Sequence, residues 1–343
     1  MVWHRIQKSW KWLLRNWSIR GENMKKASTR EAYGKTLVEL GEKNRDIVVL
    51  DADLSGSTKT QMFAQKFPER FFNMGISEQD MMGTAAGLAV AGKIPFASTF
   101  AIFATGRAWE QIRQSIAYAG LNVKIVASHG GITVGDDGGS HQALEDVALM
   151  RILPNMTVIV PADAIEMAQV IRLITEYYGP VYVRSSRIAF PVIYENKNYS
   201  FKIGKADIVR EGDELTIISM GLMVHHALAA ASLLALEGIE ARVINMSTIK
   251  PIDEEIIIDS AQKTGLIVTV EEHSIIGGLG SAVCEVVSEK YPVPVKRMGI
   301  KDRFGISGKP EKLLSYFKLT PQDIAQEAKK LLNNKPRLLR AAN

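Results

Sequence analysis

The sequence predicts an α/β protein made of two doubly wound domains in succession. Short apolar runs that suit buried parallel strands alternate with helical segments, an order that is typical of a doubly wound parallel sheet. The alternation restarts after a stretch that contains proline and asparagine but has no period. The length of 343 residues suits two domains, and 46% hydrophobic with 23% charged residues is ordinary globular composition.

The first domain is expected at residues 24–190. It opens with an amphipathic helix over 29–43, which Ser28 or Thr29 can cap, and a buried strand over 47–54 follows. The alternation then continues through a helix rich in small residues at 76–92, a strand at 94–99, a helix at 103–120, a strand at 124–129, a glycine-rich loop at 130–142, a strand at 157–162, a helix at 164–177 and a strand at 180–186.

A linker is expected at 191–205 and a second domain at 206–333. Gly277, Gly278 and Gly280 open one of its helices, which leaves a nucleotide phosphate site and close helix packing as two alternatives there. The second domain repeats the pattern of the first with strands at 215–221, 241–246, 265–272 and 293–299, and with helices at 223–237, 253–263, 280–290 and 321–332.

The two ends of the chain differ from the body. Residues 1–23 combine basic side chains with three tryptophans spaced seven apart, which places the rings on one face of a helix, and a basic tail covers 334–343. The first segment lacks the uninterrupted apolar region of a signal peptide. We interpret it as a translated leader ahead of a natural start at Met24, with an interfacial membrane helix as the alternative.

Composition excludes several classes of function. The net charge of +5 does not indicate nucleic-acid binding, because it is concentrated in the two ends and the body is slightly acidic. No apolar stretch approaches the roughly 20 residues that cross a bilayer, so no membrane span is expected. Cys284 is the one cysteine, which rules out an internal disulfide and a cysteine-based metal site. We expect a cytoplasmic protein.

Polar and aromatic residues gather where predicted strands end, which is where doubly wound sheets bind ligands. Asp51 and Asp53 end the first strand, Phe100 follows the next, and His129 ends the third. Two histidines and two adjacent aspartates share the stretch SHGGITVGDDGGSHQ, a composition typical of a functional loop. A metal site is an alternative, although His129 and His141 have no standard ligand spacing.

Two further motifs have both a structural and a functional interpretation. Glu78 opens the helix that begins in GISEQDMMGTAAGLA, where the helix dipole favours an acid and Ser77 can act as the cap. Phe100 and Phe103 are three apart in STFAIF, a spacing that also suits core packing. Each motif alone is weak evidence for a site.

The order of the motifs is more specific than any one of them. ADLSGS, FFNMGISEQDMMGTAAGLA, STFAIFATGRAWEQIR and SHGGITVGDDGGSHQ follow one another in a string that resembles the C-terminal half of transketolase, its pyrimidine-binding domain followed by its C-terminal domain. The resemblance covers about residues 24–332. It implies an enzyme that uses thiamine diphosphate to transfer a two-carbon ketol unit from a ketose phosphate to an aldose phosphate, with pentose-phosphate intermediates as the default sugars.

The resemblance implies cofactor contacts for four residues. Glu78 matches the glutamate that hydrogen-bonds the ring nitrogen of the aminopyrimidine and favours its imino tautomer, a role that needs a carboxyl able to hold a proton. Phe103 matches the aromatic residue that stacks on the pyrimidine, and Phe100 lies beside it. Asp53 is expected near the cofactor at a subunit contact. The family often has a tyrosine where this chain has Gly106, so a thinner aromatic wall is expected.

Substrate contacts are implied as well. His129 and His141 match catalytic histidines that line the sugar channel, and Asp137 matches an aspartate that hydrogen-bonds a sugar hydroxyl. Arginine suits the phosphate end because its planar group donates two parallel hydrogen bonds. The residues that match the phosphate-end ligands are Arg30, Ser57 and Arg187, with Arg184 as the rival for Arg187.

One family feature is missing from the chain. The N-terminal half of the family binds the cofactor's diphosphate through Mg2+, with a GDG motif followed by an asparagine, and this sequence has no such pattern. We therefore expect a separate N-terminal transketolase subunit that carries the magnesium ligands, an active site between the two kinds of chain, and an α2β2 heterotetramer. The C-terminal domain is expected to form a dimer and to support the site.

Three other functions stay open at this point. The β subunit of a 2-oxoacid dehydrogenase has the same domain order and also lacks the diphosphate motif. A deoxyxylulose-phosphate synthase-like enzyme is close in chemistry but is normally one long chain. A regulatory or scaffold subunit is the non-enzyme alternative, although Glu78, His129, Asp137 and His141 argue against it. The loop GGITVGDDGGSHQ favours sugar transfer, because a 2-oxo acid needs no array of hydroxyl and phosphate ligands.

Overall fold

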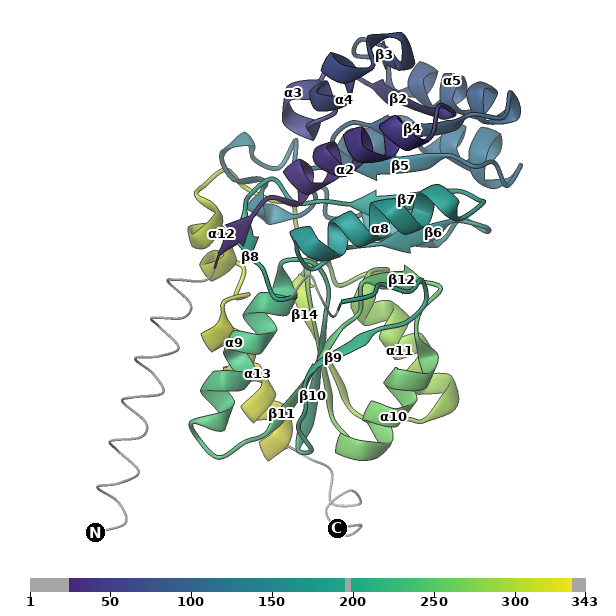
Figure 1. The fold of residues 1–343 in the computed structure, drawn as a ribbon. Coiled ribbons are helices and arrows are strands. Elements are labelled where there is room, and N and C mark those ends of the chain that lie inside the picture. Colours follow the sequence, from purple (N-terminus) through teal and green to yellow (C-terminus); the bar gives the residue numbers. More distant parts are fainter. Residues whose placement is uncertain (1–24, 195–198, 335–343) are drawn as a thin grey trace.

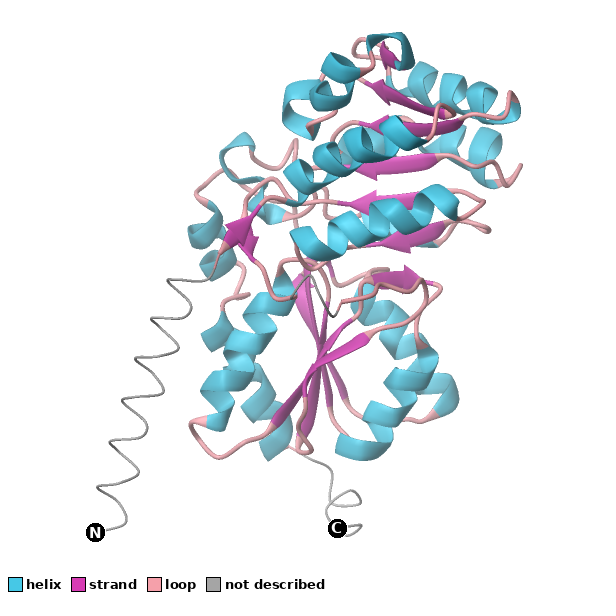
Figure 2. Ribbon diagram, in the orientation of Figure 1, coloured by secondary structure: helices cyan, strands magenta, loops and turns pink. Residues whose placement is uncertain are grey.

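The computed structural model describes residues 25–194 and 199–334, which form two α/β units, one above the other in Figure 1. Each unit is a twisted sheet with helices on both faces (Figure 2). The predicted fold class is therefore confirmed. The predicted leader at 1–23 and all but the first residue of the basic tail lie outside the described residues. Within the described part, no helix is long and apolar enough to cross a membrane.

The first sheet is parallel apart from one edge strand. Its central strands are apolar and buried on both faces, as expected for a parallel sheet between two helix layers. The edge strand β12 is antiparallel to its neighbour β6. The spatial order is β12 (Thr248–Lys250), β6 (Thr157–Ile159), β7 (Val181–Arg184), β5 (Lys124–Ala127), β4 (Ile94–Ser98), β2 (Ile47–Asp51) and β3 (Phe71–Asn73).

Two helix layers cover this sheet. On one face, Leu37 and Met167 from neighbouring helices share a buried cluster with strand residues such as Val49. On the other face, Met81 and Ile112 pack in a second cluster. The first layer consists of α2 (Thr29–Lys43) and α8 (Ala164–Glu176), and the second of α5 (Glu78–Val90), η2 (Phe103–Arg107), α6 (Trp109–Gln111) and η3 (Ile112–Ala117).

The second sheet has five strands and is parallel except for one edge strand. That edge strand, β9, runs antiparallel to β11. The spatial order is β14 (Val295–Ile300), β13 (Ile267–Ser274), β10 (Leu215–Ser219), β11 (Ala241–Asn245) and β9 (Asp207–Arg210). The helices that cover it are α9 (Met223–Ala235) and α13 (Pro321–Asn333) on one face, and α10 (Glu254–Thr264) and α11 (Leu279–Lys290) on the other.

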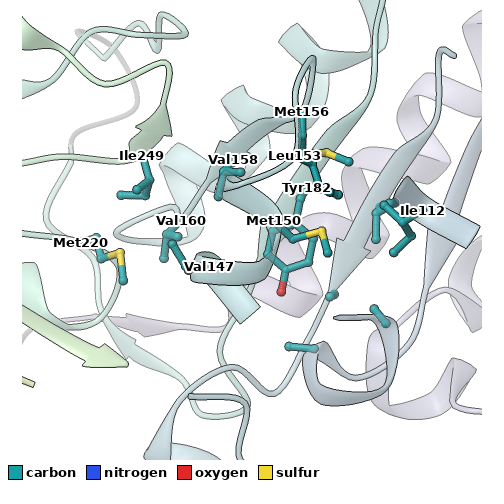
Figure 3. Close-up of a cluster of buried hydrophobic side chains, with 14 of the residues drawn as sticks. Ile112, Val147, Met150, Leu153, Met156, Val158, Val160, Tyr182, Met220 and Ile249 are labelled. Carbon is teal, nitrogen blue, oxygen red and sulfur yellow. The ribbon is translucent and has the colours of Figure 1, made fainter. Parts of the chain in front are cut away.

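The two units share strands and a continuous core. Strand β12 follows β11 in the chain but joins the first sheet, so the chain of the second unit completes the sheet of the first. Figure 3 shows that Val160 and Met220 come together near Ile249 in one buried cluster, with Val158 further along it. The second unit therefore fixes the position of the first through packing as well as through the linker.

Several elements differ from their sequence prediction. The helix predicted at 103–120 is three short pieces, two of them π-helical, and it ends at Ala117. Strands β9 and β12 were not predicted, because each is too short for a periodic signal and is defined by a distant partner. Other short elements without prediction are β1 (Lys26–Ala27), α3 (Ser55–Thr58), α4 (Gln61–Lys66), η1 (Pro68–Arg70), β3, α7 (Asp146–Arg151), β8 (Phe190–Pro191) and α12 (Pro310–Tyr316).

A buried polar group joins the two units. The Asp146 carboxylate accepts a hydrogen bond of 2.7 Å from the Tyr182 hydroxyl and pairs with Arg184 Nε at 3.3 Å. Arg184 Nη2 in turn donates to the backbone carbonyl of Glu272 in β13 at 3.0 Å. Asp146 and Arg184 are almost fully buried, so loss of one partner would leave an uncompensated charge in the core.

Arg184→Met is therefore expected to lower the free energy of unfolding by about 3 kcal/mol, because it leaves the Asp146 carboxylate buried without its cation. The measurement is urea unfolding followed by circular dichroism. Arg172→Met is the matched control. It breaks a half-exposed pair with Glu39 and should cost less than about 1 kcal/mol. Equal losses in the two variants would contradict the role of Arg184 as a tie between the units.

Candidate functional site

Glu78 occupies the first turn of α5, with its carboxyl largely buried. The side chain is 5% exposed and faces a surface depression of about 420 Å³, whose lining also includes Ile76, Gln79 and Arg107. The positive end of the helix dipole favours a carboxylate at this position. Ser77 is at the N-cap position, but its side chain makes no capping hydrogen bond, so the predicted cap is wrong.

An aromatic cluster lies next to this depression. Phe100 and Phe103 are stacked with ring centroids 5.8 Å apart, and the Phe100 ring also stacks on His129 at 3.7 Å. His141 meets Phe103 edge-on at 5.4 Å. The Arg107 guanidinium lies 4.1 Å from the centroid of the Phe103 ring and donates to Glu78 Oε1 at 2.9 Å, so it links the cluster to the carboxyl. The structure thus brings five of the predicted residues into one row of contacts: Glu78, Phe100, Phe103, His129 and His141.

His129 is held in an unusual backbone conformation. Its φ of 63° lies in the left-handed region, which non-glycine residues seldom adopt and which is often found at functional sites. Nδ1 lies 2.8 Å from the Ser128 hydroxyl. Burial, together with the nearby positive charges of Arg30 and Arg187, lowers the pKa of His129 to about 3. At neutral pH the ring is therefore uncharged and offers one donor and one acceptor.

The three residues predicted at the phosphate end lie together. Arg30 Nη1 donates to the carbonyl of Ser57 at 2.5 Å, and Arg30 Nη2 donates to the carbonyl of Arg187. The Arg187 guanidinium lies 3.7 Å from Asp137 Oδ1 and also donates to the carbonyl of Val134. Burial and the like charge of Arg187 lower the pKa of Arg30. Two arginines this close form a concentrated positive field that suits an anion.

Arg184, the alternative ligand for the phosphate end, is buried in the core and already bonded there. It pairs with Asp146 and donates to two backbone carbonyls, those of Ala143 and Glu272. Arg187 is instead about one-third exposed and faces the loop at 130–142. The geometry therefore favours Arg187 as the anion ligand.

Asp53 lies apart from the row of contacts. Its side chain is exposed at the end of β2, where Oδ1 accepts a hydrogen bond from Asn73 Nδ2 at 3.0 Å. The buried acid in this motif is Asp51, which accepts from Leu54 N, Thr58 Oγ1 and Thr60 Oγ1. Burial raises the pKa of Asp51. Asp51 shapes the turn that presents Ser57, a role that its place in an apolar strand did not reveal.

The glycine-rich loop is braced by the second unit. The Glu272 carboxylate accepts from Thr133 N at 3.1 Å and from Thr133 Oγ1 at 2.8 Å, and Gln142 Nε2 donates to the carbonyl of Ile306 at 2.9 Å. Gly131 has a φ of 85°, and a Cβ there would lie 2.3 Å from Glu272 Cδ. Glu272 is a site-supporting residue that the sequence analysis missed. The sequence feature that could have identified it is the acidic pair at the end of the apolar run at 265–272.

The glycine turn before α11 holds a carboxylate of the chain itself. Glu271 Oε2 accepts from Leu279 N and Oε1 accepts from Gly280 N, both at 2.8 Å, and a Cβ on Gly278 would lie 2.1 Å from Glu271 Oε2. Burial raises the pKa of Glu271 to about 7. The position that a phosphate would take at this helix N-terminus is thus filled, which favours the packing interpretation over the nucleotide site.

Metal ligands do not converge anywhere in residues 25–194 and 199–334: no group of three His, Cys, Asp or Glu side chains is placed to hold an ion. His129 and His141 each lie beside a serine hydroxyl and an aromatic ring. The carboxyl of Glu78 and the ring of Phe103 are thus placed to meet one side of a planar heterocycle.

Known proteins with this combination of domains identify the family. The pyrimidine binding domain of transketolase matches residues 25–192, and the C-terminal domain of transketolase matches residues 204–324. The chain belongs to the transketolase family. The predicted family and enzyme class are thereby confirmed, and the alternatives of a 2-oxoacid dehydrogenase β subunit and a deoxyxylulose-phosphate synthase are not favoured.

Individual relatives correspond to the C-terminal section of transketolase. A putative transketolase C-terminal section from Methanocaldococcus jannaschii is 56% identical over 299 residues, which cover 87% of this chain and 94% of the relative. A 6-deoxy-6-sulfo-D-fructose transketolase subunit from a Clostridium species is 44% identical over 306 residues, with coverage of 89% and 95%. The solved structure of a split gene transketolase, an inactive beta4 tetramer, matches with a TM-score of 0.82 and 53% identity over 90% of this chain and 99% of that chain. This transketolase chain therefore corresponds to the C-terminal section of the family, the pyrimidine-binding domain followed by the C-terminal domain.

Gly131→Ala is expected to loosen the loop at 130–142, because the added Cβ meets the Glu272 carboxyl and the backbone is in the left-handed region. Amide hydrogens of this loop should exchange about tenfold faster by hydrogen–deuterium exchange. Gly106→Ala is the control, since a Cβ there has nothing within 4 Å and the residue has no positive φ. Unchanged exchange in Gly131→Ala would show that Glu272 does not hold the loop.

Proposed function

We propose that this subunit supplies the pyrimidine side of a thiamine diphosphate site and the sugar-binding loop of a two-subunit transketolase, which moves a two-carbon ketol unit from a ketose phosphate to an aldose phosphate. The observation that carries the proposal is the row of contacts from Glu78 through Arg107 to Phe103 and the two histidines. When bound, the cofactor supplies the carbon nucleophile that carries the two-carbon unit.

The residues of this chain have distinct tasks in the proposed site. Glu78 would hydrogen-bond the aminopyrimidine ring, a role that its place at the edge of an open depression supports. Phe103 would offer its ring face as a stacking platform, with Phe100 behind it. A planar group already lies on Phe103 and bonds to Glu78, namely the Arg107 guanidinium, so the two residues fit a planar nitrogen-bearing ring.

The sugar would meet residues of the braced loop. His129, uncharged at neutral pH, is suited to exchange hydrogen bonds with a carbonyl or hydroxyl group, and His141 contacts both phenylalanine rings edge-on. Asp137 would accept a hydrogen bond from a sugar hydroxyl. Arg30 and Arg187, with Ser57 beside them, would bind the anionic end of the substrate by charge-assisted hydrogen bonds.

The rest of the cofactor would be held by another chain. No three carboxylate or histidine side chains converge on a metal site in the part of the chain that the structure describes. We infer that an N-terminal transketolase subunit provides the Mg2+ and diphosphate contacts, in an α2β2 assembly with the active site between the two kinds of subunit. Since thiamine diphosphate sites need both halves, the chain alone should not transfer ketol units.

We expect the substrates to be sugars that carry an anionic end group. Pentose-phosphate intermediates in the cytoplasm are the default, and the Clostridium relative is named for a sulfonated ketose, so donors with a phosphate and with a sulfonate end should both be assayed. Arg30 and Arg187 would serve either anion, because both present oxygen acceptors to a guanidinium. Decarboxylation of a 2-oxo acid is the assay for the alternative reaction.

Glu78→Gln is expected to lower turnover by about 10³-fold in the assembled enzyme, since the amide keeps the shape of the carboxyl but cannot hold the proton. The measurement is release of an aldose from a ketose phosphate with partner subunit, Mg2+ and thiamine diphosphate present. Asp80→Asn, an exposed acid in the same helical turn, is the control and should leave turnover within about twofold of the unsubstituted enzyme.

Two results would contradict this proposal. The first is a Glu78→Gln rate close to that of the unsubstituted enzyme, which would remove the carboxyl from the reaction. The second is full ketol transfer by the pure chain without any partner, which would remove the need for a second subunit.

A further inference from the structure

Arg107 satisfies two groups of the site at once. Its Nη1 donates to Glu78 Oε1 at 2.9 Å, while the carbon of its guanidinium lies 4.1 Å from the centroid of the Phe103 ring. Arg107 is 52% exposed at its side chain, whereas Glu78 is 5% exposed. One planar cation on the rim of the depression thus covers both the carboxyl and the ring face.

A guanidinium and an aminopyrimidine share the features that matter here. Both are flat, both offer nitrogen-bound hydrogens in their plane to a carboxyl, and both stack on an aromatic face. The proposed function assigns Glu78 and Phe103 to the aminopyrimidine, so Arg107 covers the same two ligands. The two groups cannot share them.

From this overlap we propose that Arg107 is a displaceable occupant of the pyrimidine position, which neutralises Glu78 in the unloaded subunit and swings out when thiamine diphosphate binds. The inference rests on the proposed function and adds a regulatory contact to the same site. Arg107 then opposes cofactor binding, in contrast to the residues that hold the cofactor.

The local backbone suits this role. Arg107 ends the π-helical segment η2, a distortion that is often found at functional sites, and the bulge turns its side chain back over Phe103. Its carbonyl accepts a hydrogen bond of 3.1 Å from Gln79 Nε2, so the backbone is tied to α5. Only the side chain has to move, and because it is half exposed its charge can return to water at little cost.

The contact also explains how the subunit tolerates Glu78 before assembly. A buried carboxylate without a partner is costly, and Arg107 is the one cation that pairs with Glu78 in residues 25–194 and 199–334. Removal of Arg107 should therefore destabilise the unloaded chain and favour any ligand that satisfies Glu78.

Arg107→Met tests the inference by cofactor affinity, which is separate from turnover. The variant keeps the length and apolar stem of the side chain but removes the charge and the plane. The Kd for thiamine diphosphate is measured by quenching of tryptophan fluorescence in the complex with partner subunit and Mg2+. The Kd of the variant complex should be about fivefold lower than that of the unsubstituted complex, because the cofactor no longer has to displace a half-exposed ion pair and a cation–π contact. Arg113→Met removes an exposed arginine of η3 and is the matched control, with Kd unchanged.

A double-mutant cycle on the isolated subunit provides a second readout. Arg107→Met should lower the thermal unfolding midpoint by roughly 2–4 °C. The loss should be clearly smaller when Glu78→Gln is already present, because the amide needs no cation and only the contact with the Phe103 ring is then lost. Arg107→Lys gives a further variant if the methionine variant does not fold. It keeps the charge but cannot stack as a plane, so its Kd should lie between those of the unsubstituted and methionine forms.

The outcomes separate the two proposals. If the unsubstituted complex binds no thiamine diphosphate, the proposed function itself is wrong. If that complex binds the cofactor but Arg107→Met binds it with equal or weaker affinity, Arg107 is a bystander or a cofactor ligand, and the displaceable occupant is refuted. A loss of stability of the same size in the Glu78→Gln background would likewise overturn the pairing on which the inference depends.

Discussion

The burial of the Glu78 carboxyl at an open rim is the constraint on which the rest of the site depends. Helix α5 starts at this residue, so its first turn fixes the carboxyl beside the aromatic pair and leaves one side free. A carboxyl with so little exposure needs a donor in contact with it. Arg107 is that donor in the described chain, and the proposed cofactor is a planar alternative to it. In this account, Glu78 exchanges Arg107 for the cofactor when the cofactor binds.

The two units divide the work between them. The first provides the carboxyl, the aromatic rings and the histidines at the carboxyl ends of its strands, as expected for a doubly wound sheet. The second provides Glu272 and the carbonyl of Ile306, which hold the glycine-rich loop from below, and strand β12, which completes the first sheet. The two units also share one continuous buried core.

The sequence predicted the long elements and the order of motifs well, since α2 and α5 have strong local patterns of apolar and small residues. Local pattern could not show which distant groups meet. Thr133 and Glu272 are 139 residues apart, and β12 is a strand only because β6 lies beside it. For the same reason the sequence did not show that Asp51 is the buried acid of its motif, and Arg107 went unnoticed because its partner Glu78 lies 29 residues away in the chain.

A crystal structure of this subunit with its partner, Mg2+ and thiamine diphosphate is the most direct test of the central claim that the chain forms one side of a shared pocket. The account predicts that Glu78 lies within hydrogen-bonding distance of the pyrimidine ring, that Arg107 has left it, and that the diphosphate and the metal are held by the partner. A cofactor enclosed only by copies of this chain, or a Glu78 side chain directed away from the ring, would contradict it.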